Sequence, residues 1–371
     1  MNTRVGLHKT LCLLRALLCL SLLAISRHSA HAETALSQNP VYTAGESGVH
    51  TYRIPSLVAA PDGTLLAFCE ARNRSRSDAG DIDLVVKRST DNGNTWSHAL
   101  VLWDDGPNTC GNPCAVVDRA TGVVWLLMTW NSGVVHESKI QPGFGEDSRR
   151  VFVTHSDDNG QSWEPPREIT RQVKPAAWSW YATGPGAGIQ LERGEHRGRL
   201  VIPCDHGPAR TESKRSRSHV IYSDDHGATW QLGGSVIGDT NESEVVELSD
   251  GRLMLNMRNS DRTQDTRLVA TSEDGGENWS APSHDDTLVE PICQASIRRM
   301  RWEVSESPSV ILFSNPATRS KRRHLTVRAS YDDGQTWPVA RRLHSGGSAY
   351  SCLCSLPDGA VGCLYERDDY A

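Results

Sequence analysis

The chain has 371 residues, of which 37% are apolar and 23% are charged, and this balance excludes a disordered tail or a fibre. Acidic residues outnumber basic ones by 45 to 39, so nucleic acid is not an expected partner. The 31 glycines and 18 prolines are spread along the chain, which disfavours a helical bundle. Many short strands joined by turns fit this composition better.

Residues 1–32 have the features of an export signal. Arg4 and Lys9 supply a basic start, residues 16–25 are apolar, and residues 30–32 form a small-residue cleavage site. The apolar run is too short to span a membrane, so no stable membrane span is expected. We therefore predict an exported protein, which is secreted or periplasmic in a bacterium and lysosomal or extracellular in a eukaryote.

Eight cysteines follow residue 32, an even number that is compatible with disulfides in an oxidising compartment. Cys110 and Cys114 are four residues apart, but no His pair or second Cys pair accompanies them. They are therefore interpreted as core or bridge residues rather than zinc ligands. No metal site and no cofactor are expected.

One motif, Ser-x-Asp-x-Gly-x-(Thr/Ser/Asn)-Trp, recurs five times, and we call each copy an Asp box. The copies begin at Ser89, Ser156, Ser223, Ser272 and Ser330. In each box the glycine suits a backbone with positive φ and the aspartate binds amides of its own turn, which predicts a hairpin turn. Apolar and β-branched residues precede the boxes, so each box is expected to join two antiparallel strands. We expect the boxes to have a structural role rather than a calcium- or ligand-binding one.

The spacing of the boxes predicts the architecture. They start 67, 67, 49 and 58 residues apart, and each interval is long enough for a four-stranded sheet, as in a propeller blade. Two further strand pairs carry no box, at residues 52–68 and 351–365. We therefore predict an all-β fold, a six-bladed β-propeller built from four-stranded antiparallel sheets, with both ends of the chain in one blade. No linker divides residues 33–371, which are expected to form one domain.

The segment Tyr52-Arg53-Ile54-Pro55, followed by Asp boxes, resembles the exo-α-sialidases (neuraminidases) over residues 52–366. The resemblance implies a sialidase catalytic domain that hydrolyses terminal α-linked sialic acids of glycoproteins, glycolipids (gangliosides) or oligosaccharides, with retention through a tyrosyl-linked intermediate. Two alternatives stay open: transfer of the sialic acid to a sugar acceptor, as in a trans-sialidase, and a sialic-acid-binding propeller without turnover. Family members continue with another strand after the segment that matches Glu366. If that strand is absent here, either residues 36–43 close the last blade or the blade stays incomplete, with an open sheet edge.

The carboxylate of a sialic acid calls for fixed positive charge, and a guanidinium group pairs with a carboxylate through a planar fork. The resemblance implies that three arginines bind it: Arg53, Arg258 and Arg322. An isolated arginine is by default a solvated surface charge, but Arg53 lies in an otherwise apolar strand. For the third arginine, alternatives nearby in the sequence stay open: Arg319, Arg323 and Arg328.

The anomeric carbon of a sialic acid already bears a carboxylate, so a carboxylate nucleophile would meet like-charge repulsion. Sialidases with a tyrosine nucleophile are an exception to the two-carboxylate scheme of glycosidases. The resemblance places this tyrosine at Tyr350. A free phenol has a pKa of about 10 and needs a base during attack, for which the resemblance implies Glu242. Strand alternation places Glu244 on the same face, which keeps Glu244 open as a rival.

The leaving oxygen needs a general acid, and the resemblance implies a loop aspartate at Asp78. Its loop position suits an acid that must be exposed to substrate, although Asp81 and Asp83 follow closely. Further substrate contacts are implied near the 4-hydroxyl of the sugar and in the pocket wall: Arg72, Trp178, Tyr181 and Gln294.

Overall fold

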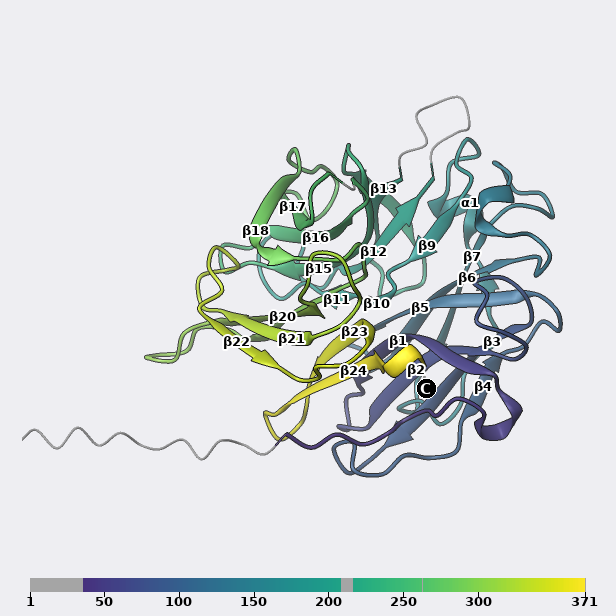
Figure 1. Ribbon diagram of the computed structural model, residues 1–371. Helices are drawn as coiled ribbons and strands as arrows, with labels where there is room; N and C mark the ends of the chain where they lie inside the picture. Colours follow the sequence, from purple (N-terminus) through teal and green to yellow (C-terminus); the bar gives the residue numbers. More distant parts are fainter. Residues whose placement is uncertain (1–35, 208–215, 262, 371) are drawn as a thin grey trace, which may run out of the picture. The chain divides into compact units, whose positions relative to one another are not determined.

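The computed structural model describes residues 36–207, 216–261 and 263–370, so the predicted export signal at residues 1–32 lies outside the described residues. The chain from Gln38 onward forms one unit. In its described part this unit is built of β-sheets, and its helical elements are short (Figure 1). They are η1 (Glu46–Gly48), η2 (Glu137–Lys139), α1 (Thr170–Val173) and η3 (Asp368–Tyr370).

The strands form five hydrogen-bonded sheets in the part of the chain that the structure describes. The first sheet joins two antiparallel groups, β1 (Thr51–Ala59), β2 (Leu65–Arg72), β3 (Ile82–Ser89) and β4 (Leu100–Trp103), and β5 (Thr109–Val117), β6 (Val124–Asn131), β7 (Arg150–Ser156) and β8 (Arg167–Glu168). A short strand, β10 (Gly186–Ala187), pairs with β5 in parallel. The second sheet contains β9 (Tyr181–Thr183), β11 (Ile189–Gln190), β12 (Leu200–His206), β13 (Arg217–Ser223) and β14 (Gln231–Ser235).

Two four-stranded antiparallel sheets and a smaller sheet complete the unit. The former consist of β15 (Thr240–Glu247), β16 (Leu253–Asn259), β17 (Thr266–Ser272) and β18 (Ser283–Val289), and of β19 (Ser296–Arg301), β20 (Val310–Pro316), β21 (Leu325–Ser330) and β22 (Val339–Arg342). The smaller sheet consists of β23 (Ser348–Ser355) and β24 (Val361–Arg367).

The inner strands follow one another in a closed circuit. β1 contacts β5 and β23, β5 contacts β12, β12 contacts β15, β15 contacts β19, and β19 contacts β23. Antiparallel sheets arranged in this way around a shared centre form a β-propeller. The all-β fold and the four-stranded antiparallel sheets expected from the sequence are confirmed, whereas the number of six blades stays a prediction.

Each Asp box joins the two outer strands of its group, as expected: β3 to β4, β7 to β8, β13 to β14, β17 to β18 and β21 to β22. In the second box Asp158 Oδ1 accepts hydrogen bonds from the Ser156 hydroxyl at 2.8 Å and from the Ser162 amide at 2.9 Å. The Ser162 hydroxyl donates to Asp158 Oδ2 at 2.5 Å, and Gly160 has a φ of 79°. The box is therefore a self-contained turn that needs no ligand.

The boxes also hold neighbouring sheets together. A Cβ atom added at Gly160 would lie 2.6 Å from a methyl carbon of Leu66, which belongs to the preceding strand group. At Gly227, in the third box, an added Cβ would lie 2.2 Å from the Trp125 ring. The glycines therefore serve both the positive φ of the turn and the close packing between sheets.

The cysteines form no disulfide in the described structure, so the bridges that an even number suggested are wrong here. Eight free thiols are present: Cys69, Cys110, Cys114, Cys204, Cys293, Cys352, Cys354 and Cys363. All but Cys363 are buried. Cys110 and Cys114 lie in β5 among core side chains, which agrees with their interpretation as core residues. A buried thiol behaves as a small apolar side chain.

Of the two outcomes expected for the last blade, closure by residues 36–43 does not occur, because residues 36–43 contain no strand. The last sheet consists of β23 and β24 alone in the described residues. Gln38 contacts β24 through its side chain, whose Oε1 accepts hydrogen bonds from Tyr365 Oη at 3.0 Å and from Arg367 Nη1 at 3.1 Å. The first and last described segments of the unit therefore meet at this sheet.

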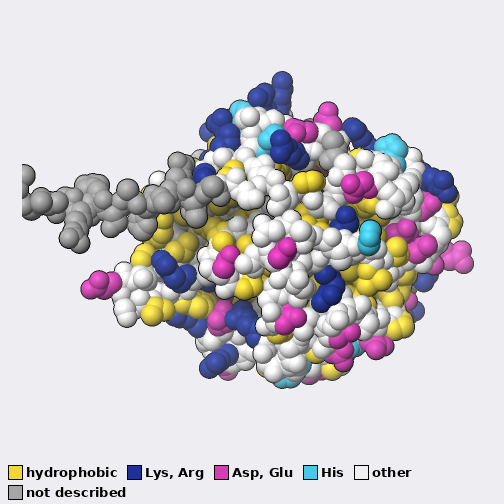
Figure 2. Space-filling model, turned by 90° about the horizontal axis from the view of Figure 1, so that it is seen from below, with side chains coloured by type: hydrophobic (Ala, Val, Ile, Leu, Met, Phe, Trp, Pro, Cys, Tyr) yellow, Lys and Arg dark blue, Asp and Glu magenta, His cyan; other side chains and the backbone are white. Residues whose placement is uncertain are grey.

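Charges of both signs are interspersed over the face of the molecule that Figure 2 shows. This distribution agrees with the small formal net charge of −6. None of the helices in the described ranges is both long and apolar enough to cross a membrane.

Replacing Asp158 by alanine is expected to lower the free energy of unfolding by about 1–2 kcal/mol, because several hydrogen bonds within the box are lost. Partial burial opposes ionisation, but hydrogen bonds from Ser162 and Ser156 lower the pKa of Asp158 to about 2. Its stabilising effect is therefore present above pH ~4 and lost as the pH falls through about 2. Chemical denaturation measures the effect, and Asp157→Ala, an exposed neighbour, is the control. Equal losses in the two variants would contradict the structural role of the box.

Candidate active site

Arg53 is a buried cation whose charge is compensated by Glu366. It lies in β1 and is 8% exposed. Its Nε and Nη2 atoms donate to the two carboxylate oxygens of Glu366 in β24, at 3.0 and 3.2 Å. The same carboxylate accepts hydrogen bonds from the backbone amides of Ile54, at 2.9 Å, and Tyr350, at 3.1 Å. Our sequence reasoning missed Glu366, for which the available signal was a carboxylate directly after the apolar residues 363–365.

Tyr350, Glu242 and Arg258 form a hydrogen-bonded group. Tyr350 lies in β23, is 6% exposed, and donates from its hydroxyl to Glu242 Oε1 at 2.5 Å. Arg258, near the end of β16, donates from Nη1 to Glu242 Oε2 at 2.6 Å and to Tyr350 Oη at 3.2 Å. Burial raises the pKa of Tyr350 well above its ordinary value, and the charge of Glu242 raises it further, against the nearby arginines. The phenol therefore stays protonated until Glu242 accepts its proton.

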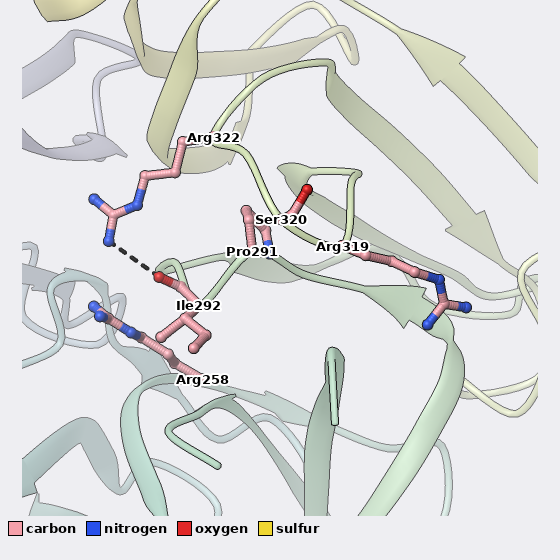
Figure 3. Close-up of a pocket in the computed structure, with 6 residues that line it drawn as sticks. All are labelled: Arg258, Pro291, Ile292, Arg319, Ser320 and Arg322. Atoms are coloured by element: carbon pink, nitrogen blue, oxygen red, sulfur yellow. Dashed lines mark hydrogen bonds between the residues drawn. The ribbon is translucent and has the colours of Figure 1, made fainter. Parts of the chain in front are cut away.

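Arg322 faces the same phenol ring. Its guanidinium carbon lies 5.6 Å from the centre of the Tyr350 ring, and Arg53 approaches this ring to 5.2 Å. Arg322 Nη2 donates to the Ile292 carbonyl at 3.0 Å, the contact drawn as a dashed line in Figure 3. A cavity of about 370 Å³ opens beside it and is lined by Arg258, Pro291, Ile292, Arg319, Ser320 and Arg322.

The alternatives for the third arginine make other contacts, although Arg319 lines the same cavity. Arg319 points away from Arg258 and Arg322 in Figure 3 and forms an ion pair with Asp265. Arg323 is exposed and donates to the His324 ring. Of these neighbours, Arg322 is the one that the structure brings to Tyr350.

Asp78 lies on the loop between β2 and β3, with its side chain 73% exposed. Arg72 Nη1 approaches its carboxylate to 2.7 Å and Arg53 Nη1 to 3.3 Å. Partial burial opposes ionisation, but the charges of Arg72 and Arg53 outweigh it and lower the pKa of Asp78. Arg72 is in turn held by Glu70, at 2.7 Å. The loop thus brings a carboxylate to the edge of the arginine cluster.

The neighbouring aspartates are directed into other contacts. Asp81 and Asp83 both accept hydrogen bonds from Asn73 Nδ2, at 2.6 and 2.8 Å. Asp81 also pairs with Arg74 at 3.2 Å. Burial raises the pKa of Asp83 to about 6, aided by the nearby charge of Asp104. Among these three loop aspartates, Asp78 is the one in contact with Arg53.

The predicted wall residues lie deeper than expected. Tyr181 is fully buried and packs beside Trp178 and His219, and its contact with a substrate stays a prediction. Trp178 is partly exposed, and its ring stacks on His206 with a centroid distance of 3.4 Å. Stacking between the large ring and the buried imidazole removes apolar surface of both from water. The contact of Trp178 with a sugar stays a prediction.

Gln294 and Glu244 lie in the interior between the inner strands. Gln294 is fully buried and donates from Nε2 to the carbonyls of Pro185 and Ser351, at 3.1 and 3.0 Å. Glu244 accepts hydrogen bonds from Ser296 Oγ at 2.7 Å and from the Ile297 amide at 2.9 Å. The structure thus places Glu242, and not its rival Glu244, at the phenol. The contact of Gln294 with a substrate stays a prediction.

Arg149 is a buried cation that the sequence did not reveal. It is 2% exposed, and burial lowers its pKa to about 10. Its nitrogens donate to the side chains of Asn131 and Asn112 and to the carbonyl of Tyr181. It follows a surface loop in the sequence and is adjacent to a second arginine, so no pattern distinguished it from a solvated charge.

The arrangement can bind an organic anion and deliver a nucleophile beside it. Arg53, Arg258 and Arg322 supply positive charge, and Tyr350 supplies a phenol whose proton has an acceptor in Glu242. Among the described residues, no group of three or more His, Cys, Asp or Glu side chains is arranged to hold a metal ion.

Comparisons with known proteins agree with this fold. A family model described as a BNR repeat-like domain matches residues 63–363, which defines the class of propeller to which the chain belongs. A sialidase of Micromonospora viridifaciens is 36% identical over 345 residues, covering 88% of this chain and 52% of that protein. An exo-alpha-sialidase of Aspergillus fumigatus is 32% identical over 349 residues, covering 86% of this chain and 80% of that protein. The chain belongs to the sialidase family.

A solved structure gives the same result. The Hadza microbial sialidase Hz136 superposes with a TM-score of 0.80 at 35% identity, covering 87% of this chain and 64% of that one. The chain thus spans about half the length of the Micromonospora sialidase, 52%, and 64% of the Hadza structure.

Glu244 is expected to make stability depend on pH. Burial raises its pKa to about 7 from an ordinary 4.5, against hydrogen bonds that lower it. The folded state therefore keeps a proton that the unfolded state loses between pH 4.5 and about 7, so this contribution to stability is lost as the pH rises through that window. The loss amounts to at most about 3 kcal/mol.

The measurement is the unfolding free energy of wild type and Glu244→Gln at several pH values between about 4 and 8. The difference in unfolding free energy between the two proteins should change between pH 4.5 and about 7, because the glutamine amide does not titrate. Glu306→Gln, at an exposed position, should keep the wild-type slope. Parallel curves for wild type and Glu244→Gln would show that Glu244 is ionised throughout.

Proposed function

We propose that this protein is an exo-α-sialidase, which hydrolyses terminal α-linked sialic acids of glycoproteins, glycolipids or oligosaccharides. One observation carries the proposal: the Tyr350 hydroxyl, hydrogen-bonded to Glu242, is surrounded by three guanidinium groups. A sialic acid carries its carboxylate on the anomeric carbon itself, so arginines that bind the anion bring that carbon to the phenol. The sialidases among its relatives support the same reading.

Binding of the carboxylate relies on arginines that are already in place. Glu366 holds Arg53 through two hydrogen bonds, so little side-chain freedom remains to be lost when a ligand binds. Arg322 presents its guanidinium above the Tyr350 ring with one nitrogen anchored on a carbonyl. A buried guanidinium interacts more strongly with an anion than a solvated one does, because less water screens it.

In the first chemical step, Tyr350 Oη attacks the anomeric carbon and its proton moves to Glu242 Oε1 along the 2.5 Å hydrogen bond. The bond between that carbon and the glycosidic oxygen breaks, and Asp78 gives this oxygen a proton. The products of the step are a tyrosyl-linked sugar and a free alcohol. A phenol is suited to the attack because it approaches the anionic centre without a charge of its own.

In the second step, a water molecule attacks the same carbon and gives a proton to Asp78. The bond to Tyr350 breaks, and the phenolate recovers its proton from Glu242. Both carboxyl groups return to their starting states. Two displacements at one carbon give a product with the configuration of the substrate, so the proposed reaction proceeds with retention.

Asp78 must be protonated to act as an acid, although Arg72 and Arg53 lower its pKa in the free protein. A bound sugar carboxylate offsets the charge of Arg53 and removes water from the loop, and both effects raise the pKa of Asp78. Substrate binding therefore favours the protonated form of Asp78, which can act as the acid. The rate of the first step is expected to fall as the pH rises through the pKa of Asp78 in the complex.

We also propose that the protein is exported, which rests on the basic start, apolar run and small-residue site of residues 1–32. Sialylated glycans are surface-exposed, so an exported hydrolase would meet them outside the cytoplasm.

Replacing Tyr350 by phenylalanine tests the nucleophile. Removing the hydroxyl is expected to lower kcat for a fluorogenic aryl sialoside by at least about 10²-fold, with little change in fold, because the ring is kept. Activity equal to that of wild type would show that the phenol takes no part in bond formation.

The products of the wild-type reaction separate hydrolysis from transfer and from binding alone. Free sialic acid should be released from an aryl sialoside at the same rate with and without added lactose. NMR of the product at early times should show the α-anomer first. Formation of a new sialoside in the presence of lactose would indicate transfer, and absence of release would leave a binding protein.

Replacing Asp78 by asparagine tests the acid. An alkyl leaving group needs protonation, so kcat for sialyllactose is expected to fall about 10²–10⁴-fold. An aryl leaving group departs more readily as an anion, so the loss with an aryl sialoside should be much smaller. Asp81→Asn is the matched control, because Asp81 bonds Asn73 and Arg74 rather than the arginine cluster. Equal losses on both substrates would contradict the role of Asp78.

A further inference from the structure

We propose that Arg267 and Glu290 form a positioning pair that fixes Arg258 and Arg322 from behind the pocket. This inference rests on the proposed function and adds two residues to it. Arg267 lies in β17, and its side chain is 0% exposed, while Glu290, directly after β18, is 1% exposed. Arg267 Nη1 and Glu290 Oε2 are 2.7 Å apart. Neither side chain reaches the pocket, so any effect on the reaction passes through other residues.

The pair forms hydrogen bonds with the backbone on both sides of Arg258. Glu290 Oε1 accepts a hydrogen bond at 2.6 Å from the amide of Asn259, the residue that follows Arg258. Arg267 Nε donates to Asn256 Oδ1 at 2.7 Å, and Nη2 donates to the Asn256 carbonyl at 3.3 Å. The end of β16 is therefore tied at positions 256 and 259, and Arg258 stands between these two anchors.

The same pair holds the turn on which Arg322 rests. Arg267 Nη1 donates to the Cys293 carbonyl at 2.8 Å. The preceding residue, Ile292, has a φ of 54°, an uncommon conformation for a β-branched side chain. Its carbonyl accepts the hydrogen bond from Arg322 Nη2 at 3.0 Å (Figure 3). A strained residue keeps its conformation where its surroundings fix it from both sides, and here Glu290 and Cys293 do so.

One buried ion pair thus determines where two of the three guanidinium groups stand relative to each other. Stability alone gives a weak reason for such a pair, because well-packed apolar residues often replace a buried ion pair without loss. The fork of Arg267 reaches three acceptors at once: Glu290, Asn256 and Cys293. Lysine has no such planar fork, so it cannot make these contacts together.

The kinetic consequence follows from what the arginines bind. A sugar carboxylate is present both in the bound substrate and in the transition state, so arginines that bind it act on both. Loosening them therefore raises KM and leaves kcat nearly unchanged. Damage to the nucleophile or the acid has the opposite signature, a loss in kcat.

The test compares wild type with Arg267→Gln/Glu290→Gln, a double variant that leaves no single buried charge behind. KM and kcat are measured with an aryl sialoside, together with the inhibition constant of 2,3-dehydro-2-deoxy-sialic acid and the thermal midpoint of each protein. We expect KM and the inhibition constant to rise about tenfold or more while kcat stays within about threefold.

The matched control is Arg199→Gln/Asp224→Asn. Arg199 is also buried, with its side chain 4% exposed, and binds Asp224 through two hydrogen bonds of 2.8 and 2.9 Å. It lies on a different sheet and stacks on Tyr222. This variant is expected to lose thermal stability but to keep the wild-type KM and inhibition constant.

Arg267→Lys is the second test and decides the matter if the double variant does not fold. It keeps the charge but lacks the fork, so a smaller rise in KM is expected. An unchanged KM in the folded variants, or an equal rise in the control, would overturn the inference. A wild-type protein without sialidase activity would instead contradict the proposed function, a result that needs no variant to be recognised.

Discussion

Close packing of several positive charges beside a phenol is the constraint on which the rest of the site depends. Guanidinium groups repel one another, and burial strengthens that repulsion because water no longer screens it. The structure offsets it with carboxylates from other strands: Glu366 holds Arg53, and Glu242 holds Arg258. In the described residues Arg322 bonds a carbonyl, that of Ile292, and has no carboxylate within ion-pair distance. Its charge is therefore the least compensated of the three and the most available to an incoming anion.

The propeller supplies these partners because its inner strands converge. The residues around the phenol come from β1, β15, β16, β23 and β24 and from the loop between β20 and β21, which carries Arg322, so four different sheets contribute. Each inner strand except β23 belongs to a strand group whose outer turn is an Asp box. The boxes thus do no chemistry themselves, yet they support the strands that carry it, since their glycines pack against neighbouring sheets.

Much of this was predictable from the sequence because it resides in local patterns. A turn motif that bonds to itself can be recognised without its surroundings, and all five boxes join strands as expected. Tyr350 and Glu242 were found through short motifs, and the structure places them 2.5 Å apart. Strand alternation could not separate Glu242 from Glu244, because a register shift interrupts β15 after Thr240.

The rest depends on contacts between distant segments. Glu366 pairs with a residue 313 positions away, and nothing near it in the sequence indicates that pairing. An even number of cysteines is a property of composition, and all eight cysteines are free thiols in the described structure. The resemblance placed Tyr181 in the pocket wall, whereas packing against Trp178 and His219 buries it.

The ion pair between Arg53 and Glu366 also makes the active site depend on the attachment of β24. Detaching β24 would cost little apolar contact, since its sheet has two strands, but it would strip Arg53 of its counter-charge and free the backbone amides of Ile54 and Tyr350. Local detachment of β24 would therefore abolish activity while the other sheets stay intact. Inactivation by mild heat or denaturant should then precede the loss of secondary structure, because the contact between Arg53 and Glu366 breaks first.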